Sequence, residues 1–144
     1  MRLPGIYLFD DVDPELSLLP FAARRALDCA GLHLSLSGWQ KLALEARQTL
    51  VRLGAEELVD RGAVERMLEH GDDVRPEPAL CEPAPELGPS AELLTLLPEA
   101  HGLTAERWAR LSGLDRYVLL QLSRRGKRER LAQAWAEIRG LSTR

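Results

Sequence analysis

The feature that most constrains this chain is a helical pattern that is written twice. The stretch GWQKLALEARQTLVRL at 38–53 aligns with RWARLSGLDRYVLLQL at 107–122, and five residues recur 69 positions later. They are Trp39, Leu42, Arg47, Leu50 and Leu53, then Trp108, Leu111, Arg116, Leu119 and Leu122. One helical repeat cannot cover its own apolar face, whereas two can bury their faces jointly. The pattern therefore predicts two pseudo-repeated halves, about 18–70 and 90–140, packed on one core.

Four helices are expected in the first half: 20–31, a short helix that carries Trp39, 44–53 and 55–70. Pro20 suits the first position of a helix because it has no N–H to leave unpaired, and Gly31 suits a left-handed helix end. Ser35 and Ser37 are candidate N-caps of the short helix. Gly54 is expected to close the third helix.

A proline-rich connector separates the halves. The stretch GDDVRPEPALCEPAPELGPS at 71–90 holds five of the nine prolines. Alternating prolines are incompatible with a helix or with the interior of a sheet, since each removes a backbone donor. The composition predicts an extended, acidic connector.

The helical pattern restarts after the connector. Ser90 is a candidate cap for a segment reaching His101, which Pro98 must kink or divide. Thr104 is expected to cap a short helix that carries Trp108, and Ser112 one over 113–124. A final helix over 127–139 has an apolar stripe that should be buried: Leu131, Ala134, Trp135 and Ile138.

These patterns predict an all-α fold. About seven to eight short helices should form a single domain over 1–144, a length that suits one domain. The apolar run IYLF at 6–9 predicts a short extended arm or an edge strand ahead of them.

The familiar catalytic and cofactor motifs are missing from the sequence. It has no phosphate loop, HExxH, paired CxxC or GxSxG elbow, so we expect no catalytic residues, cofactor or metal. The histidines are scattered: His33, His70 and His101. The turn DDVDPE resembles a calcium loop only faintly and is expected to be an ordinary solvated turn. Cys29 should be buried and Cys81 exposed, neither with a partner that would activate it.

The charge is distributed unevenly along the chain. The net charge is −3, yet residues 107–144 contain ten Arg and Lys against three Asp and Glu. The N-terminus has Pro, Gly and acidic residues where a signal peptide would be apolar, and no apolar run approaches the length of a membrane span. We therefore expect a cytoplasmic protein with no membrane contact.

The basic residues near the C-terminus have two interpretations. The first is a patch for a protein partner, formed by Arg124, Arg125, Lys127, Arg128 and Arg130. The alternative is a DNA-binding helix-turn-helix using 104–130, with phosphate contacts from these residues. The pI near 5.7 disfavours nucleic acid. Arg116 also has a counterpart in Arg47, so both are expected to bond a carboxylate, such as that of Asp28, or helix-end carbonyls.

Two segments carry a resemblance to a known family. They are LLPFAARRALDCAGLHLSLSGWQKLALEARQTLV at 18–51 and HGLTAERWARLSGLDRYVLLQLSRR at 101–125. Their order of residues resembles the nitrate reductase-associated protein family over most of 7–138. The matching positions are Pro20, Arg24, Leu27, Asp28, Gly31, Leu34, Trp39, Arg47, Trp108, Leu111, Arg116, Leu119, Leu122, Ser123 and Arg124. Where the family often has a histidine-containing stretch after this, the chain reads RGKRE.

The resemblance implies a small helper protein linked to assimilatory nitrate reductase, a molybdenum enzyme of the cytoplasm. It implies no catalytic residue and no bound cofactor. We therefore expect a non-catalytic accessory protein that assists maturation or assembly of the reductase, or of a related molybdoenzyme, by protein contact. A DNA-binding regulator remains the alternative, and an enzyme of unknown type is a third.

Overall fold

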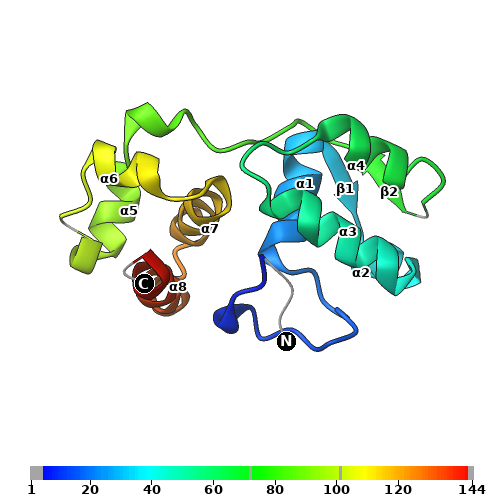
Figure 1. The fold of residues 1–144 in the computed structure, drawn as a ribbon, viewed down its shortest axis with the longest axis horizontal. Coiled ribbons are helices and arrows are strands. Elements are labelled where there is room, and N and C mark those ends of the chain that lie inside the picture. The colour runs from blue at the N-terminus through cyan, green and yellow to red at the C-terminus, as the bar shows by residue number, and fades with distance from the viewer. Residues whose placement is uncertain (1–4, 72, 101, 143–144) are drawn as a thin grey trace. The chain divides into compact units, whose positions relative to one another are not determined.

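The computed structural model describes residues 5–71, 73–100 and 102–142, and there the fold is predominantly helical, as predicted (Figure 1). The described α-helices are α1 Phe21–Ala30, α2 Leu36–Lys41, α3 Leu44–Ala55, α4 Arg61–Met67, α5 Ala91–Leu96, α6 Ala105–Arg110, α7 Gly113–Arg124 and α8 Arg128–Ser142. Two short strands, β1 Leu32–Leu34 and β2 Val74–Pro76, accompany them. Short 3₁₀ helices occupy Leu8–Asp10, Pro85–Leu87 and Pro98–Ala100.

The chain groups into two compact units. Ile6 and Asp10–Cys81 belong to the first, whereas Tyr7–Phe9 and the residues from Glu82 onward belong to the second. The prediction of one domain over 1–144, with halves 18–70 and 90–140, stays a prediction.

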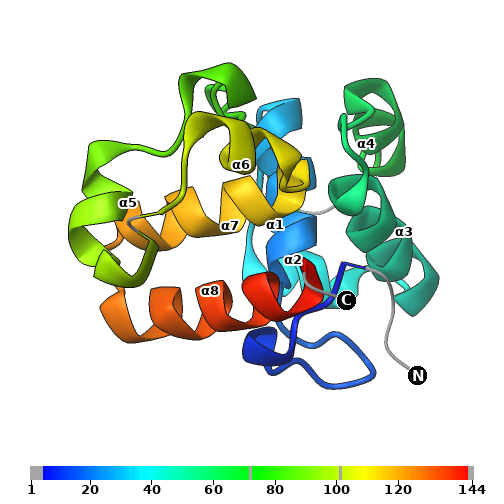
Figure 2. The ribbon, with the colours of Figure 1, turned by 60° about the vertical axis from the view of Figure 1, so that its left-hand side comes forward.

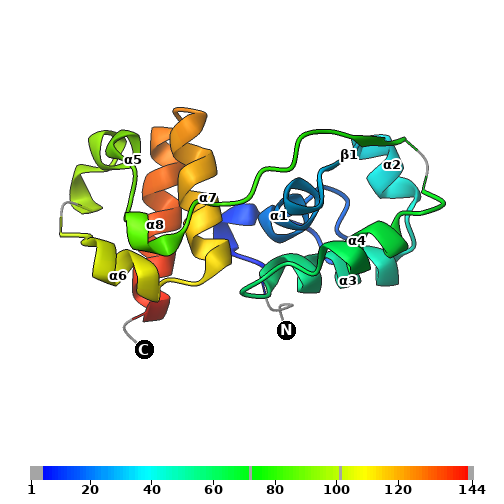
Figure 3. The ribbon, with the colours of Figure 1, turned by 90° about the horizontal axis from the view of Figure 1, so that it is seen from above.

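The first unit is built on the packing of α1 against α3 (Figure 3). Ala22 and Ala26 on α1 and Leu50 and Val51 on α3 are fully buried. Gly54 of α3 lies so close to α1 that a Cβ atom on it would be 1.6 Å from the carbonyl oxygen of Ala22. The sequence prediction that Gly54 ends the helix is wrong, because α3 continues to Ala55. Gly54 is needed for close helix packing rather than for a helix end.

A buried arginine ends α3. Arg25 of α1 is 2% exposed and donates through its guanidinium to the carbonyl oxygens of Gly54 at 2.9 Å, Glu56 at 2.5 Å and Glu57 at 2.8 Å. The last carbonyls of a helix have no partner within it, so the guanidinium supplies what further helical turns would supply. The chain therefore leaves the helical conformation at Glu56, whose φ and ψ are −70° and 151°.

The predicted helix over 55–70 is shorter than expected. Only Arg61–Met67 is α-helical, and Asp60 caps it by accepting from Ala63 N at 3.1 Å. Val59 lies outside the helix, in which Val64 is buried, and Leu68 is buried just beyond the helix end. The helix starts later than predicted because Arg25 bonds the carbonyls of Glu56 and Glu57, where the chain has left the helical conformation.

The start of the connector forms a strand, which the sequence analysis did not predict. Leu32↔Pro76, His33↔Arg75 and Leu34↔Val74 pair antiparallel between β1 and β2. Beyond the strand, Leu80 N donates to the carbonyl of Asp28 at 2.8 Å. Pro76 is tolerated because a two-stranded ribbon leaves every residue at an edge. The sequence analysis also did not predict the 3₁₀ turn at Pro85–Leu87 within the connector.

In the second unit the predicted caps are confirmed. The side chains of Ser90, Thr104 and Ser112 accept from Leu93 N, Arg107 N and Asp115 N, each at 3.1 Å. In the first unit Ser35 likewise caps α2, accepting from Gly38 N at 3.0 Å. Pro98 divides its segment as expected, since α5 stops at Leu96 and a 3₁₀ turn follows. His101 lies outside the described residues.

Helices α7 and α8 lie side by side and make the core of the second unit (Figure 2). The final helix begins at Arg128 and continues to Ser142, beyond the predicted end at 139. Leu131, Ala134 and Ile138 are buried as predicted. Trp135 is only half-buried, so the prediction that it is buried with the rest of the stripe is wrong.

The N-terminal run at 6–9 is neither an extended arm nor an edge strand. Leu8–Asp10 is a 3₁₀ turn, and the ring of Tyr7 is buried, with 5% of the residue exposed. The second unit therefore contains a three-residue piece from the start of the chain.

Candidate functional site

The predicted basic patch lies on the turn between α7 and α8. All five of its side chains are exposed, and we call them the basic cluster: Arg124, Arg125, Lys127, Arg128 and Arg130. Gly126, with φ of 64°, closes the turn. Its N–H donates to the carbonyl of Ser123 and that of Lys127 to the carbonyl of Leu122, both at 3.1 Å. This pair of bonds around a left-handed glycine is a Schellman motif, which brings the end of α7 and the start of α8 together.

The basic cluster has few partners inside the protein. Arg130 donates to the carbonyl of Phe9 at 3.0 Å. For the other four side chains no ion pair is recorded with any residue that the structure describes. Their charges are therefore available to another molecule.

Part of the cluster opposes the helix dipole. Arg128 is the first residue of α8 and Arg130 its third, where the helix end carries partial positive charge. A cation there costs about 0.3–1 kcal/mol, whereas Arg124 at the end of α7 is placed favourably. Folding alone gives no reason for the basic side chain of Arg128 at the start of α8.

A second candidate surface holds the strap, which we define as Tyr7–Phe9. One carboxylate, that of Glu137, accepts from two successive main-chain N–H groups, those of Leu8 at 2.9 Å and Phe9 at 3.2 Å. The hydroxyl of Tyr7 donates to the carboxylate of Asp115 on α7. The rings of Tyr7 and Phe9 stack with their centroids 4.8 Å apart. Glu137 and Arg130 thus bond the main chain of the strap, and Asp115 bonds the side chain of Tyr7.

Asp115 is the acidic group of this surface with a shifted pKa. Burial raises the pKa of its carboxyl above the ordinary 3.8, and the hydrogen bonds from Tyr7 and Ser112 oppose that rise. A carboxylate so placed gains more from a charge-assisted hydrogen bond than an exposed one does. Tyr7 therefore stabilises the ionised form of Asp115.

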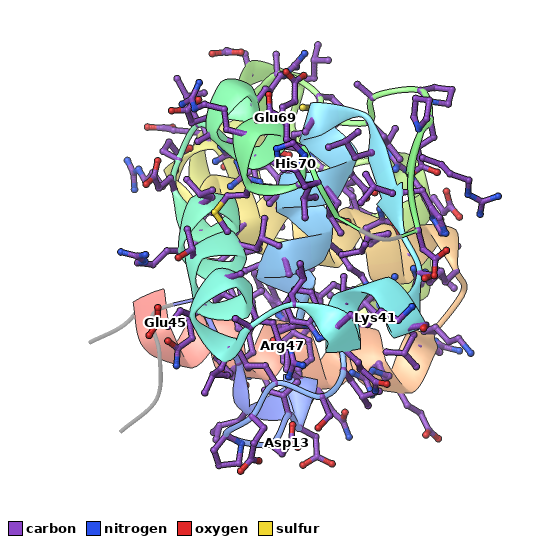
Figure 4. The ribbon with its side chains drawn as sticks, turned by 90° about the vertical axis from the view of Figure 1, so that its right-hand side faces the viewer. Asp13, Lys41, Glu45, Arg47, Glu69 and His70 are labelled. Carbon is purple, nitrogen blue, oxygen red and sulfur yellow. The ribbon has the colours of Figure 1, made fainter. Side chains whose placement is uncertain are left out.

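The repeated arginines both bond the end of the preceding short helix. Arg47 donates from Nε to the carbonyl of Trp39 at 3.2 Å and from Nη2 to that of Gln40 at 2.5 Å. Its Nη1 reaches the carbonyl of Glu15 at 2.6 Å. Figure 4 shows Arg47 between α2, which carries Lys41, and the loop that carries Asp13.

Arg116 makes the corresponding contacts in the second unit. Its Nη1 donates to the carbonyls of Trp108 at 3.5 Å and Ala109 at 3.3 Å, and to that of Leu111. Helix-end carbonyls were one of the two contacts predicted for these arginines. A bond to Asp28 is not among the contacts recorded for either within the described chain. We assign both a structural role in the corner between a short and a long helix.

The corner between α2 and α3 and the corner between α6 and α7 have matching bounds. The first and last residues of α6 and α7 are those of α2 and α3 moved by 69 positions. Trp39 is 0% and Trp108 2% exposed. The indole N–H of Trp39 donates to the carbonyl of Leu16 at 2.6 Å. These are the contacts a repeat would produce, while the superposition of the two units stays a prediction.

The helix-turn-helix alternative finds little support in the burial of α7. Nine of its twelve residues are buried, and of the other three only Arg124 is exposed. A recognition helix must present one face to the major groove. Basic side chains follow α7, but α7 itself offers few groups that could contact bases.

The sequence analysis missed three residues that hold the strap or a helix end. None of Asp115, Glu137 and Arg25 was predicted to bond a residue far away along the chain. Tyr7 and Asp115 are 108 positions apart, and no local pattern pairs residues at that separation. Of the three, only Arg25 could have been noticed in the sequence, because a charged residue inside an apolar helical face indicates a buried, bonded side chain.

Among the described residues no group of three or more His, Cys, Asp or Glu side chains could hold a metal ion. Asp13 of the acidic turn accepts from the N–H and hydroxyl of Ser17, at 2.8 and 2.5 Å. Cys29 is buried as expected, whereas Cys81 is half-buried with Arg61 3.4 Å from its sulfur. None of the described helices is long and apolar enough to span a bilayer.

Comparison with known protein families gave a match over most of the chain. A family model described as "conserved nitrate reductase-associated protein" matches residues 7–138. No match was found among curated proteins or among solved structures. The matched range includes the strap, both helix corners and all of the basic cluster.

Proposed function

Because the chain belongs to the conserved nitrate reductase-associated protein family, we propose that it is a non-catalytic accessory protein of a nitrate reductase. In this proposal it assists maturation or assembly of a cytoplasmic, molybdenum-dependent reductase by protein contact. The chain itself supplies no catalytic group and holds no cofactor.

The observation that carries the proposal is the basic cluster. Four of its five cations have no recorded ion pair among the described residues, and Arg128 sits against the dipole of α8. Exposed charge of one sign accelerates encounter with a surface of the opposite sign and selects against like-charged partners. The cluster therefore suits an acidic surface on the reductase.

Binding to purified nitrate reductase from the same organism tests the proposal. We expect the triple variant Arg124→Glu, Arg125→Glu, Arg128→Glu to bind at least about tenfold more weakly, mainly through a slower association rate. Raised salt should weaken the wild type and have less effect on the variant, because screening acts on the same charges.

A matched control variant distinguishes the effect of the basic cluster on binding from the effect of net charge. Arg24, Arg66 and Arg75 are exposed on α1, α4 and β2, and changing all three to Glu alters the charge equally. This control should bind like the wild type. Equal weakening of both triples would assign the effect to net charge alone. No binding by the wild type would contradict the proposed contact.

A cellular measurement tests the accessory role. In cells that lack the gene, we expect the reductase to have reduced activity and a reduced molybdenum content. The wild-type chain and the control triple should restore both, and the cluster triple should not. Steeply salt-dependent retention on DNA, lost in the cluster triple, would favour the regulator instead.

A further inference from the structure

The strap surface consists of the side chains that bond the strap, those of Asp115 on α7 and of Arg130 and Glu137 on α8. The proposed function gives no reason why a separate piece of chain is bound there. Tyr7–Phe9 packs with the second unit, although its neighbours in the chain, Ile6 and Asp10, group with the first. The segment is only three residues long. Positive φ values at Gly5 (90°) and Asp11 (50°) mark sharp changes of direction on both sides of it.

The surface holds the strap as peptide-binding surfaces hold ligands. Glu137 and Arg130 bind main-chain groups of Leu8 and Phe9, so they would accept other side chains at those positions. Leu8 itself is 67% exposed. Selectivity lies in the buried ring of Tyr7 and its hydroxyl contact with Asp115. Main-chain contacts that give affinity, combined with one buried side chain that gives specificity, are a general scheme of peptide recognition.

The strap surface is continuous with the basic cluster. Arg130 belongs to both, since it is a member of the exposed cluster and also donates to the carbonyl of Phe9. In the chain itself the strap is followed by acidic residues, which occupy three of the next four positions: Asp10, Asp11 and Asp13. Four cations of the basic cluster have no recorded ion pair among the described residues, so carboxylates beside the tyrosine of a partner segment would add charge complementarity.

We propose that the strap surface of α7 and α8 is a docking site for a short, tyrosine-containing acidic segment of the protein partner, and that the chain's own strap occupies this site until that segment displaces it. This inference rests on the proposed function for the identity of the partner. The strap then acts as an intramolecular competitor, which reduces binding of partners whose surfaces are only weakly acidic.

Effective concentration decides when displacement occurs. A tethered segment competes at an effective concentration in the millimolar range, so a free peptide of the same sequence binds only weakly. A partner already bound at the basic cluster presents its own segment at a comparable effective concentration. The strap is therefore displaced by partners that engage the cluster first.

Peptide binding to the full-length chain tests the site directly. The probe is a fluorescently labelled peptide with the sequence of residues 5–13, GIYLFDDVD, followed by anisotropy. Tyr7→Ala removes the strap's anchor, and we expect it to bind the probe at least about tenfold more tightly than the wild type, since the site is vacated. Adding Glu137→Gln to Tyr7→Ala should reverse most of this gain. A probe in which phenylalanine replaces tyrosine should bind more weakly to Tyr7→Ala.

Two further variants control the experiment. Leu8→Ala changes an exposed side chain whose main chain makes the contact, so it should behave like the wild type. Tyr7→Phe keeps the ring and loses only the bond to Asp115. It should show a smaller gain in the same direction, even if Tyr7→Ala lowers the melting temperature. Equal affinity of the probe for wild type, Tyr7→Phe and Tyr7→Ala would overturn the proposal.

Binding of the same variants to purified nitrate reductase tests the partner. We expect Tyr7→Phe to bind several-fold more tightly than the wild type and Leu8→Ala to bind equally. If the wild type binds but Tyr7→Phe binds no better, the partner does not use the strap site and this inference fails while the proposed function stands. If the wild type does not bind at all, the proposed function fails and the partner assignment with it.

Discussion

The Cα of Gly54 faces the carbonyl of Ala22 so closely that a Cβ atom there would lie 1.6 Å from its oxygen. The neighbour is backbone of α1 rather than a flexible side chain, so α1 and α3 would have to separate. Both helices are built from fully buried residues along this contact. The approach of these two helices sets the geometry of the first unit.

Gly54→Ala should therefore be strongly destabilising. We expect a loss of about 3 kcal/mol or more in unfolding free energy, since overpacking against backbone cannot be relieved by a change of rotamer. Gly140→Ala is the control, because a Cβ atom in that part of α8 meets nothing within 4 Å. It should stabilise by up to about 1 kcal/mol. Urea denaturation followed by circular dichroism measures both, and similar midpoints for the two variants would contradict the prediction.

Arg25→Met tests the buried guanidinium. The variant keeps much of the side-chain volume but leaves the carbonyls of Gly54, Glu56 and Glu57 without their donor. We expect a loss of about 3 kcal/mol, because unsatisfied buried acceptors retain their full desolvation cost. Arg24→Met changes the exposed neighbour on the same helix and should stay within about 0.5 kcal/mol of the wild type. Hydrogen exchange should show faster opening at 55–60 in Arg25→Met alone.

Two aspartates should titrate on opposite sides of the ordinary value of 3.8. The pKa of Asp115 is raised, chiefly by burial, whereas that of Asp13 is lowered, chiefly by the hydroxyl of Ser17. Carbonyl carbon NMR should place Asp115 above 3.8 and Asp13 below it. Tyr7→Phe removes a bond that favours the ionised carboxyl of Asp115, so its pKa should rise further and that of Asp13 should not move.

The raised pKa of Asp115 has a defined effect on stability. The folded chain holds this proton more tightly than the unfolded chain, so the contribution of Asp115 to stability falls as pH rises from about 3.8 through its folded pKa. Asp115→Asn should lack this part of the pH dependence. Melting temperatures measured across that interval test it, and an identical pH profile for wild type and variant would contradict the assigned shift.

Charge reversal in the basic cluster should separate stability from binding. Arg128→Glu places a negative charge at the first position of α8 and should stabilise by about 0.5 kcal/mol, whereas Arg124→Glu at the end of α7 should destabilise by a similar amount. If the cluster serves a partner, both should weaken binding to the reductase. Thermal unfolding and binding measured on the same samples give the comparison. A fall in stability for Arg128→Glu would mean that its charge has a partner within the protein.

The sequence by itself determined the features that depend on neighbours in the chain. A serine or threonine side chain bonds an N–H three residues ahead, so Ser35, Ser90, Thr104 and Ser112 could be recognised as caps without a structure. The left-handed end at Gly31 needed only the freedom of a glycine. The helical class and the exposed basic cluster followed from periodicity and charge in the same way. Family membership followed from the order of the residues.

Only the tertiary structure decided the features that depend on atoms brought from elsewhere in the chain. The end of α3 is set by Arg25, about thirty residues earlier, whose side chain satisfies carbonyls that a longer helix would have satisfied. The strand at 74–76 exists because β1 offers its edge. Tyr7 is buried because Asp115 and Glu137 hold the strap across more than a hundred positions. Local patterns cannot specify such contacts, since the partner atoms are neighbours only after the helices have packed.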